Sequence, residues 1–78
     1  MEDMKMKCVD ERLLKYVPSK LRPYCVWLDV EKDYYDKRKR TYYAVFEKDG
    51  IEYSSDYVDS ASELTWNCRQ LLEEMGLK

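Results

Sequence analysis

Histidine is absent from this chain of 78 residues, and glycine and proline occur only twice each. Histidine is the commonest general base and metal ligand, and two isolated glycines cannot form a glycine-rich phosphate loop. No Gly-x-Ser-x-Gly segment marks a nucleophile. We therefore expect a protein that is not an enzyme, with no catalytic residue, no metal site and no cofactor.

Cysteine is scarce as well. Cys8, Cys25 and Cys68 are odd in number and widely separated, which argues against a disulfide framework and against a zinc site. No apolar run reaches the roughly 18–20 residues that span a bilayer, and the start Met-Glu-Asp-Met-Lys lacks the apolar core of a signal peptide. We expect a cytoplasmic protein with three reduced thiols and no membrane segment.

Aromatic and charged residues are plentiful instead. Eight tyrosines and two tryptophans, in a chain that is 45% hydrophobic, exclude intrinsic disorder and predict one small domain over residues 1–78. The net charge is only −2, but residues 42–78 carry eight acidic and three basic side chains, a local net charge of −5. This asymmetry is the first indication of function, and it favours a basic partner.

The first half of the chain predicts a helix and a strand. Asp10 can cap a short helix that Pro18 ends, and its apolar side comprises Val9, Leu13, Tyr16 and Val17. A β-rich strand follows from Tyr24 to Glu31. Its alternation places on the core face Tyr24, Val26, Leu28 and Val30, and on the opposite face Cys25, Trp27, Asp29 and Glu31.

The second half begins with a strand from Arg40 to Glu47, and Asp49-Gly50 then predicts a hairpin turn. Both central positions of a type I′ turn need positive φ, which these two residue types tolerate. The register fixed by a two-residue loop sets Glu47 opposite Glu52 and continues to Tyr42 opposite Tyr57. The core face of the hairpin then collects Tyr42, Ala44, Phe46, Tyr53 and Tyr57.

A C-terminal helix is the best-marked element. Ser60 and Glu63 form a capping box, and Gly76 ends the helix. Its apolar stripe comprises Ala61, Leu64, Cys68, Leu71, Leu72 and Met75. The predicted fold class is therefore α+β, with a three-stranded antiparallel sheet and with N-terminal and C-terminal helices packed on one face, in the order α-β-β-β-α.

The solvent face of this sheet is the candidate binding surface. A tryptophan and a tyrosine among carboxylates are typical of an interface core with a charged rim. Glu47 opposite Glu52 is a like-charge pair that costs about 0.2–1 kcal/mol. The alternative is that Trp27 is covered by another segment and that the acids only solvate the sheet. The predicted partner-binding residues on this face are Trp27, Asp29, Tyr43, Glu47, Glu52 and Asp56.

Two further features stand outside that face. Trp66 is expected on the polar side of the last helix. It is interpreted as a second partner contact, a homodimer contact or a ring packed over a neighbouring loop. The basic run Lys37, Arg38, Lys39 and Arg40 has tyrosines on both sides. Basic residues beside aromatic rings bind phosphates and stack on bases, so this run is the alternative nucleic-acid-binding site. The other interpretation is a solvated loop, since Asp33 and Asp36 lie beside it.

Two families resemble parts of this plan. The order helix, three antiparallel strands, helix is similar to the double-stranded RNA-binding domain, which holds phosphate through lysines at the start of its final helix. The corresponding segment here, from Asp59 to Glu63, is acidic and disfavours phosphate. Residues 42–75, with Tyr-Tyr-Ala-Val-Phe-Glu-Lys-Asp-Gly, a second strand and a helix, resemble the partial ribonuclease-H-like fold of HicB-type antitoxins.

By its general build the chain also resembles small phage anti-defence proteins, including anti-CRISPR inhibitors. An acidic face with aromatic anchors can occupy the basic groove that a nucleic-acid-handling protein uses for DNA or RNA. Together with the surface described above, this resemblance predicts an inhibitor or adaptor that binds a protein with a basic surface. The alternatives are a nucleic-acid-binding module of the double-stranded RNA-binding type and a HicB-like antitoxin. A homodimer is compatible with either.

Overall fold

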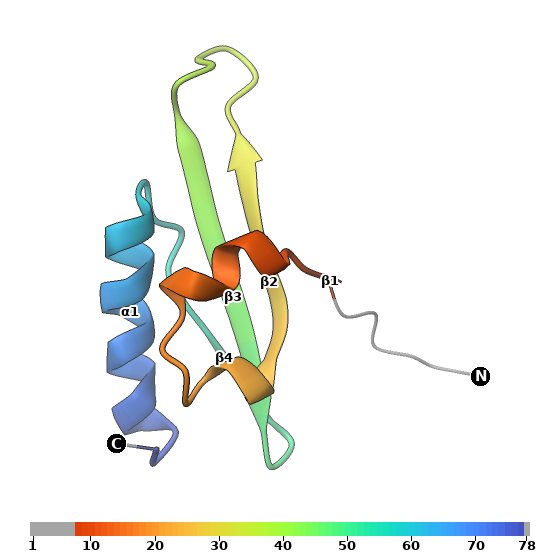
Figure 1. Ribbon diagram of the computed structural model, residues 1–78, viewed down its shortest axis with the longest axis vertical. Coiled ribbons are helices and arrows are strands. Elements are labelled where there is room, and N and C mark those ends of the chain that lie inside the picture. Colours follow the sequence, from red (N-terminus) through yellow and green to blue (C-terminus); the bar gives the residue numbers. More distant parts are fainter. Residues whose placement is uncertain (1–7, 78) are drawn as a thin grey trace, which may run out of the picture.

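The long antiparallel pair of β2 and β3 is the centre of the sheet. The computed structural model describes residues 8–77. Its strands are β1 (Cys8–Val9), β2 (Cys25–Lys32), β3 (Arg40–Lys48) and β4 (Ile51–Ser54). They lie in the order β1-β2-β3-β4, with β1 parallel to β2 and the other neighbours antiparallel (Figure 1). The sheet is therefore four-stranded and mixed, and the predicted three-stranded antiparallel sheet is corrected.

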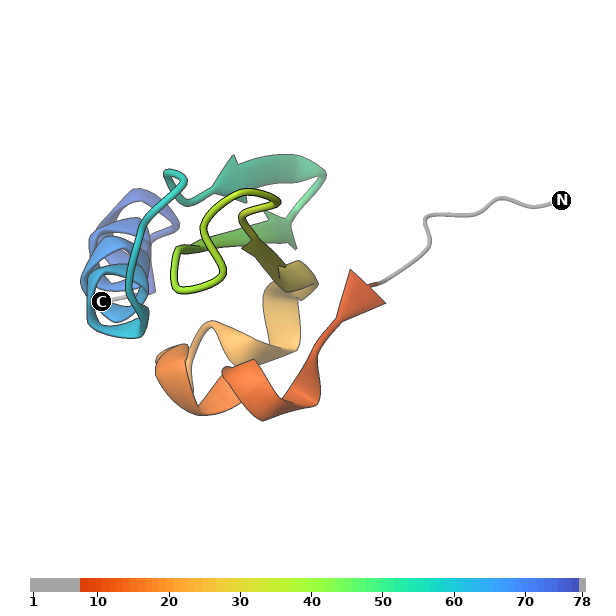
Figure 2. The same ribbon diagram turned by 90° about the horizontal axis from the view of Figure 1, so that it is seen from above.

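Three helical segments pack on one face of the sheet. The α-helix α1 (Ala61–Glu74) follows the last strand, and two 3-10 helices, η1 (Glu11–Tyr16) and η2 (Arg22–Tyr24), precede β2. Figure 2 shows α1 and the 3-10 segments on the same side of the strands. The α+β class is thereby confirmed, and the opposite sheet face carries no helix from the described part of the chain.

The predicted N-terminal α-helix is a 3-10 helix. Asp10 caps it as expected, accepting the Arg12 N–H at 3.0 Å. Backbone bonds from Leu13 to Asp10 and from Val17 to Leu14, both at 2.9 Å, span three residues. A segment of six residues ended by a proline is too short to make an α-helical nucleus favourable.

β1 was not predicted because it is only two residues long. Its Val9, which the sequence pattern assigned to the helix, pairs with Leu28. Asp10 then continues the contact, because its N–H donates to the Leu28 carbonyl at 2.9 Å. The pairing partner of this short strand lies far away in the sequence, so local periodicity gives no sign of it.

The core lies between the sheet and the helices. Its fully buried members include Val17, Leu21, Leu28, Phe46, Leu64 and Cys68. The predicted stripe of α1 is confirmed, and Ser60 Oγ caps the helix by accepting the Glu63 N–H at 3.2 Å. Thr65 donates its hydroxyl to the Tyr16 carbonyl at 2.6 Å. This bond fastens α1 to η1 across the core.

The hairpin turn forms as predicted. Asp49 and Gly50 have positive φ angles of 55° and 78°. Glu47 faces Glu52 across the pair of β3 and β4, as the two-residue loop requires. The register is therefore correct along the whole of β4.

Beyond β4 the predicted register is wrong by one residue. Tyr42 exchanges backbone hydrogen bonds with Val58, at 2.8 and 3.1 Å, where the sequence predicted Tyr57. One extra residue forms a β-bulge, and such a slip moves each later side chain to the other face. Val58 is consequently in the core, and Tyr57, predicted to be buried, is 69% exposed.

The Ser55 side chain holds this bulge. Its Oγ accepts the Ala44 N–H at 3.0 Å and its hydroxyl donates to the Asp56 carbonyl at 3.0 Å. In a regular antiparallel ladder the Ala44 N–H would bond to a backbone carbonyl of the neighbouring strand. Among residues 8–77, Ser55 is the one polar residue that is buried. Its hydroxyl therefore replaces the backbone partner that the bulge removes.

A second irregularity corrects the predicted position of Cys25. Cys25 pairs with Phe46 and Trp27 pairs with Val45, so Val26 is an extra residue in β2. Cys25 and Trp27 consequently lie on opposite faces. Cys25 is buried in the core, whereas Trp27 remains on the open face with 40% of its surface exposed.

Ser55→Ala should destabilise the protein by about 1–3 kcal/mol, because the Ala44 N–H and the Asp56 carbonyl would lose a shared partner inside the fold. Denaturant unfolding followed by circular dichroism measures this change. Ser54→Ala is the matched control, since Ser54 is exposed and its replacement should change stability by less than about 0.5 kcal/mol. Equal stability of Ser55→Ala and the wild-type protein would show that the hydroxyl does not hold the bulge.

In the folded protein only Cys8 should react with a thiol reagent at neutral pH. Cys8 is exposed, Cys25 and Cys68 are buried, and burial raises the pKa of the Cys68 thiol from 9.0 to about 12. The thiolate is the reactive form. Mass spectrometry should find Cys8 alone labelled in the native chain and all three cysteines labelled in denaturant. Rapid labelling of Cys68 in the native protein would contradict the core described above.

Candidate functional site

The open face of the sheet carries a hollow with aromatic walls. It has a volume of ≈ 180 Å³ and is lined by Trp27, Asp29, Glu31, Thr41, Tyr43 and Tyr57. Alternation along β2 and β3 supplies the first five of these residues, and the bulge at Ser55 supplies the last. We call this site the aromatic hollow.

Two of the three rings of the aromatic hollow are exposed, Trp27 and Tyr57, and the third, Tyr43, is half-buried. Tyr43 and Tyr57 stack with ring centroids 4.4 Å apart and planes inclined by 10°. Trp27 stands beside them on β2, partly exposed. Aromatic faces carry partial negative charge and attract cations. A group of exposed rings on one face is typical of a binding surface.

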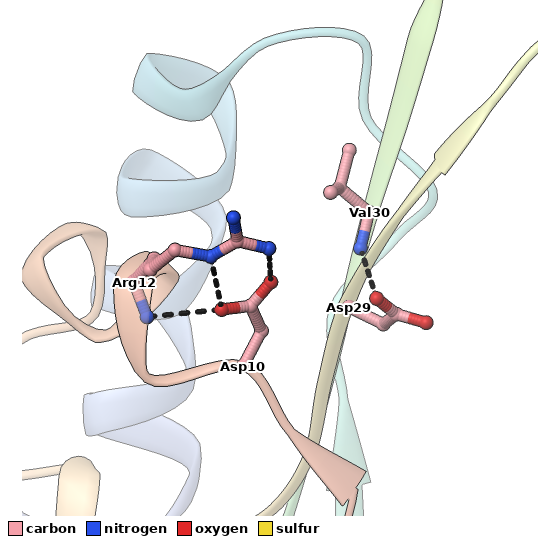
Figure 3. Close-up of polar contacts among 4 residues, drawn as sticks. All are labelled: Asp10, Arg12, Asp29 and Val30. Atoms are coloured by element: carbon pink, nitrogen blue, oxygen red, sulfur yellow. Dashed lines mark hydrogen bonds and ion pairs between the residues drawn. The ribbon is translucent and has the colours of Figure 1, made fainter.

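Two carboxylates add negative charge to the aromatic hollow. One oxygen of Asp29 accepts the Val30 N–H at 2.8 Å, which holds the side chain in place (Figure 3). Glu31 is exposed on the same strand. Figure 3 also shows the Arg12 guanidinium directed at Asp10, to which it donates at 3.1 and 3.0 Å. That contact lowers the pKa of Asp10 and raises the pKa of Arg12. Within residues 8–77, no basic residue lines the aromatic hollow.

A second concavity lies between the outer edge of β4 and α1. It has a volume of ≈ 390 Å³, with Glu52, Ser54 and Asp56 on the sheet side and Trp66, Gln70 and Glu74 on the helix side. Tyr53 and Leu71 also line it. We call this site the edge groove. Of the residues that the structure describes, three carboxylates line it and no lysine or arginine does.

The structure divides the predicted partner-binding residues between these two sites. The aromatic hollow contains Trp27, Asp29 and Tyr43, and the edge groove contains Glu52, Asp56 and Trp66. Glu47 belongs to neither and is half-buried on β3, opposite Glu52. The named residues therefore line two concavities instead of one, although Glu52 keeps its predicted place opposite Glu47.

Tyr57 takes the place opposite Tyr43 that the sequence assigned to Asp56, and Val58 takes the core place assigned to Tyr57. The prediction set Asp56 opposite Tyr43 on the open face, but Tyr57 stacks there. Asp56 turns toward α1, where its N–H donates to Asn67 Oδ1 at 2.9 Å. Tyr57 is thus a residue of the aromatic hollow that sequence reasoning missed. The residue that could have indicated the shift in register is Val58, because a β-branched apolar side chain fits a core position better than a tyrosine does.

The basic run occupies the loop between β2 and β3, at the end of that hairpin (Figure 1). Lys37, Arg38 and Lys39 are exposed. Arg40 begins β3, is half-buried and donates to the Lys37 carbonyl at 2.9 Å. Three of the four basic residues therefore face solvent.

A carboxylate orders this loop. Asp33 Oδ1 accepts the N–H groups of Tyr35 and Asp36 at 2.7 and 2.9 Å, and these bonds lower the pKa of Asp33. Tyr34 and Tyr35 are 89% and 92% exposed and touch edge to face. The loop therefore presents two rings and three cations on one ordered turn.

Residues 8–77 contain no cluster of metal ligands and no membrane-spanning helix. No three His, Cys, Asp or Glu side chains of that range come together so that they could hold a metal ion. No helix in that range is both long enough and apolar enough to cross a bilayer. No protein family, curated protein or solved structure matches the chain. The two surfaces and the basic loop are therefore the features of the molecule that bear on its function.

Tyr57→Ala should leave the fold intact and lower its stability by only about 0.5–1.5 kcal/mol, the usual contribution of an aromatic pair. The reason is that the ring is mostly exposed and stacks on Tyr43. Tyr57→Phe keeps the stack and should match the wild-type protein in urea unfolding. A loss of about 3–5 kcal/mol, typical of a buried aromatic residue, would instead place Tyr57 in the core.

Proposed function

We propose that the protein is a non-enzymatic binding module, an inhibitor or adaptor, that docks its aromatic hollow on the basic surface of a nucleic-acid-handling partner. The observation that carries this proposal is the composition of the hollow. Three rings and two carboxylates meet there, and no basic residue of the described part of the chain joins them. They do so on a sheet face that no helix of the described chain covers.

An arginine side chain matches both components of the aromatic hollow. Its planar guanidinium stacks on aromatic faces and donates hydrogen bonds to carboxylates at its edge. Such a cation–π contact contributes about 0.5–2 kcal/mol, depending on how far it is removed from water. Trp27 and Tyr57 are the residue types in which the binding energy of interfaces is concentrated. The carboxylates Asp29 and Glu31 would speed association with a positive surface.

Proteins that hold DNA or RNA present clustered lysine and arginine to phosphates. Aromatic rings beside carboxylates imitate a nucleic acid in two respects, because the rings stack as bases do and the carboxylates are negatively charged as phosphates are. The acidic excess in residues 42–78 acts in the same direction. Masking of a nucleic-acid groove also fits the build of the phage anti-defence proteins, including the anti-CRISPR type, that the sequence resembles.

A second candidate function is nucleic-acid binding through the loop between β2 and β3. The observation in its favour is the exposure of Tyr34 and Tyr35 beside Lys37–Lys39. Exposed rings next to cations can stack on bases and neutralise phosphates. The acidic residues Asp33 and Asp36 reduce the positive charge of the same loop.

Two sets of substitutions distinguish these candidates. The hollow variant combines Trp27→Ala with Tyr57→Ala, and the loop variant replaces Lys37, Arg38 and Lys39 with serine. Each chain is immobilised and exposed to a native lysate, and the retained proteins are quantified by mass spectrometry. We expect the wild-type protein and the loop variant to retain the same basic, nucleic-acid-handling protein, and the hollow variant to lose it by about tenfold or more.

Labelled DNA and RNA are titrated against the same three chains by fluorescence anisotropy. Salt-dependent binding that only the loop variant loses would assign the function to the basic loop. Retention of a basic protein that the hollow substitutions leave unchanged would contradict the proposed role of the aromatic hollow. Circular dichroism of both variants excludes unfolding as the cause.

A further inference from the structure

We infer that the edge groove receives an extended, basic segment of a partner protein, which pairs with β4 as an additional strand. This inference goes beyond the proposed function, because the edge groove and the aromatic hollow share no lining residue. In strand addition of this kind, backbone hydrogen bonds supply affinity and alternate side chains supply specificity.

The backbone of β4 is arranged for such pairing. β4 is the terminal strand of the sheet, so no strand of the described chain lies on its outer side. Lys48 and Ile51 flank the two-residue turn and form a hydrogen-bonded pair. Alternation then makes Glu52 and Ser54 the positions whose N–H and C=O groups point away from β3. Both residues line the edge groove.

The free edge is limited to this short stretch. The next outward-facing position is Asp56, whose N–H already donates to Asn67 Oδ1 of α1 at 2.9 Å. The Asp49-Gly50 turn ends the edge on the other side. Short edges restrict pairing between sheets, and this one has room for a short segment of chain.

Charge selects the segment that fits. In an antiparallel pair, the residue opposite Glu52 has its side chain on the same sheet face, where lysine or arginine forms a favourable cross-strand pair. Asp56 and Glu74 extend the negative lining on both sides of the edge groove. A second copy of β4 would instead add its own Glu52 to a groove that three carboxylates already line. Trp66, which is 61% exposed on the helix side, adds an aromatic contact for the bound segment.

A synthetic peptide of alternating arginine and valine, about six residues long like an average strand, serves as the probe. Two versions carry N-methyl groups, one on the arginine nitrogens and one on the valine nitrogens. Only every second N–H of an added strand faces β4, so one methylated peptide should bind at least about tenfold more weakly while the other binds like the parent. When an arginine of the peptide lies opposite Glu52 in an antiparallel pair, the backbone N–H groups of the arginines point toward β4. The peptide methylated on its arginine nitrogens is therefore the one that should bind weakly. Equal binding of both methylated peptides, or loss of binding by both, would overturn the inference.

Amide hydrogen exchange locates the peptide on the full chain. Addition of the parent peptide should slow exchange at the Glu52 and Ser54 amides. The Tyr53 amide, which faces Phe46 within the sheet, is the internal control. Unchanged exchange at both outward amides under saturating peptide would also overturn the inference.

Substitutions separate the edge groove from the aromatic hollow. Ser54→Pro removes an outward N–H that makes no bond to β3, so the hairpin should persist while peptide binding is lost. Ser54→Ala keeps that N–H and should bind normally. Tyr57→Ala should also bind normally. If the Tyr57→Ala variant fails to bind the peptide and the Ser54→Pro variant binds it fully, the peptide lies in the aromatic hollow. That result would overturn strand addition and leave the proposed function intact. If Ser54→Pro does not fold, the methylated peptides decide the question on the wild-type chain.

Discussion

The Ser55 hydroxyl lies between the Ala44 N–H and the Asp56 carbonyl, and both candidate surfaces depend on this contact. It stabilises the bulge that brings Val58 into the core and leaves Tyr57 outside. Without that extra residue, the face of the sheet would lack the stacked ring of Tyr57, and Asp56 would no longer reach Asn67. A polar group in a core position is costly unless it is fully bonded. The Ser55 hydroxyl meets this condition, because it bonds to both the Ala44 N–H and the Asp56 carbonyl.

Elements whose ends carry a distinctive residue could be predicted from the sequence. Asp49-Gly50 fixes the turn, Ser60 caps α1 and Gly76 ends it with a positive φ of 71°. These signals are local and operate through backbone angles that few other residues adopt. The α1 stripe was predictable for the same reason, since its period follows from helix geometry alone.

The remaining features depend on contacts between distant parts of the chain. The parallel pairing of Val9 with Leu28 unites segments that carry no shared signal, and the 3-10 form of η1 reflects its shortness. Both bulges add one residue without a glycine or proline to mark it. A slip of one residue reverses the two faces of a strand, so a small local event changed the predicted environment of Cys25 and Tyr57.

The candidate site was predictable in its residue types but not in its division into two surfaces. Acidic and aromatic residues on alternate positions could be named from the sequence, and six of the seven named residues line one of the two concavities. Their separation follows from the position of α1 beside β4, which the helical period does not specify. Asp56 joined the helix side because Asn67 accepts its N–H.

The bulge also restricts how this protein can change over evolutionary time. Asp56 faces the edge groove and its neighbour Tyr57 faces the aromatic hollow, so the peptide bond between them belongs to both surfaces. A substitution that alters this turn changes two candidate surfaces in one step. Residues such as Trp27 on β2 and Glu74 on α1 carry no such double constraint, and they are the positions at which one surface can diverge while the other is preserved.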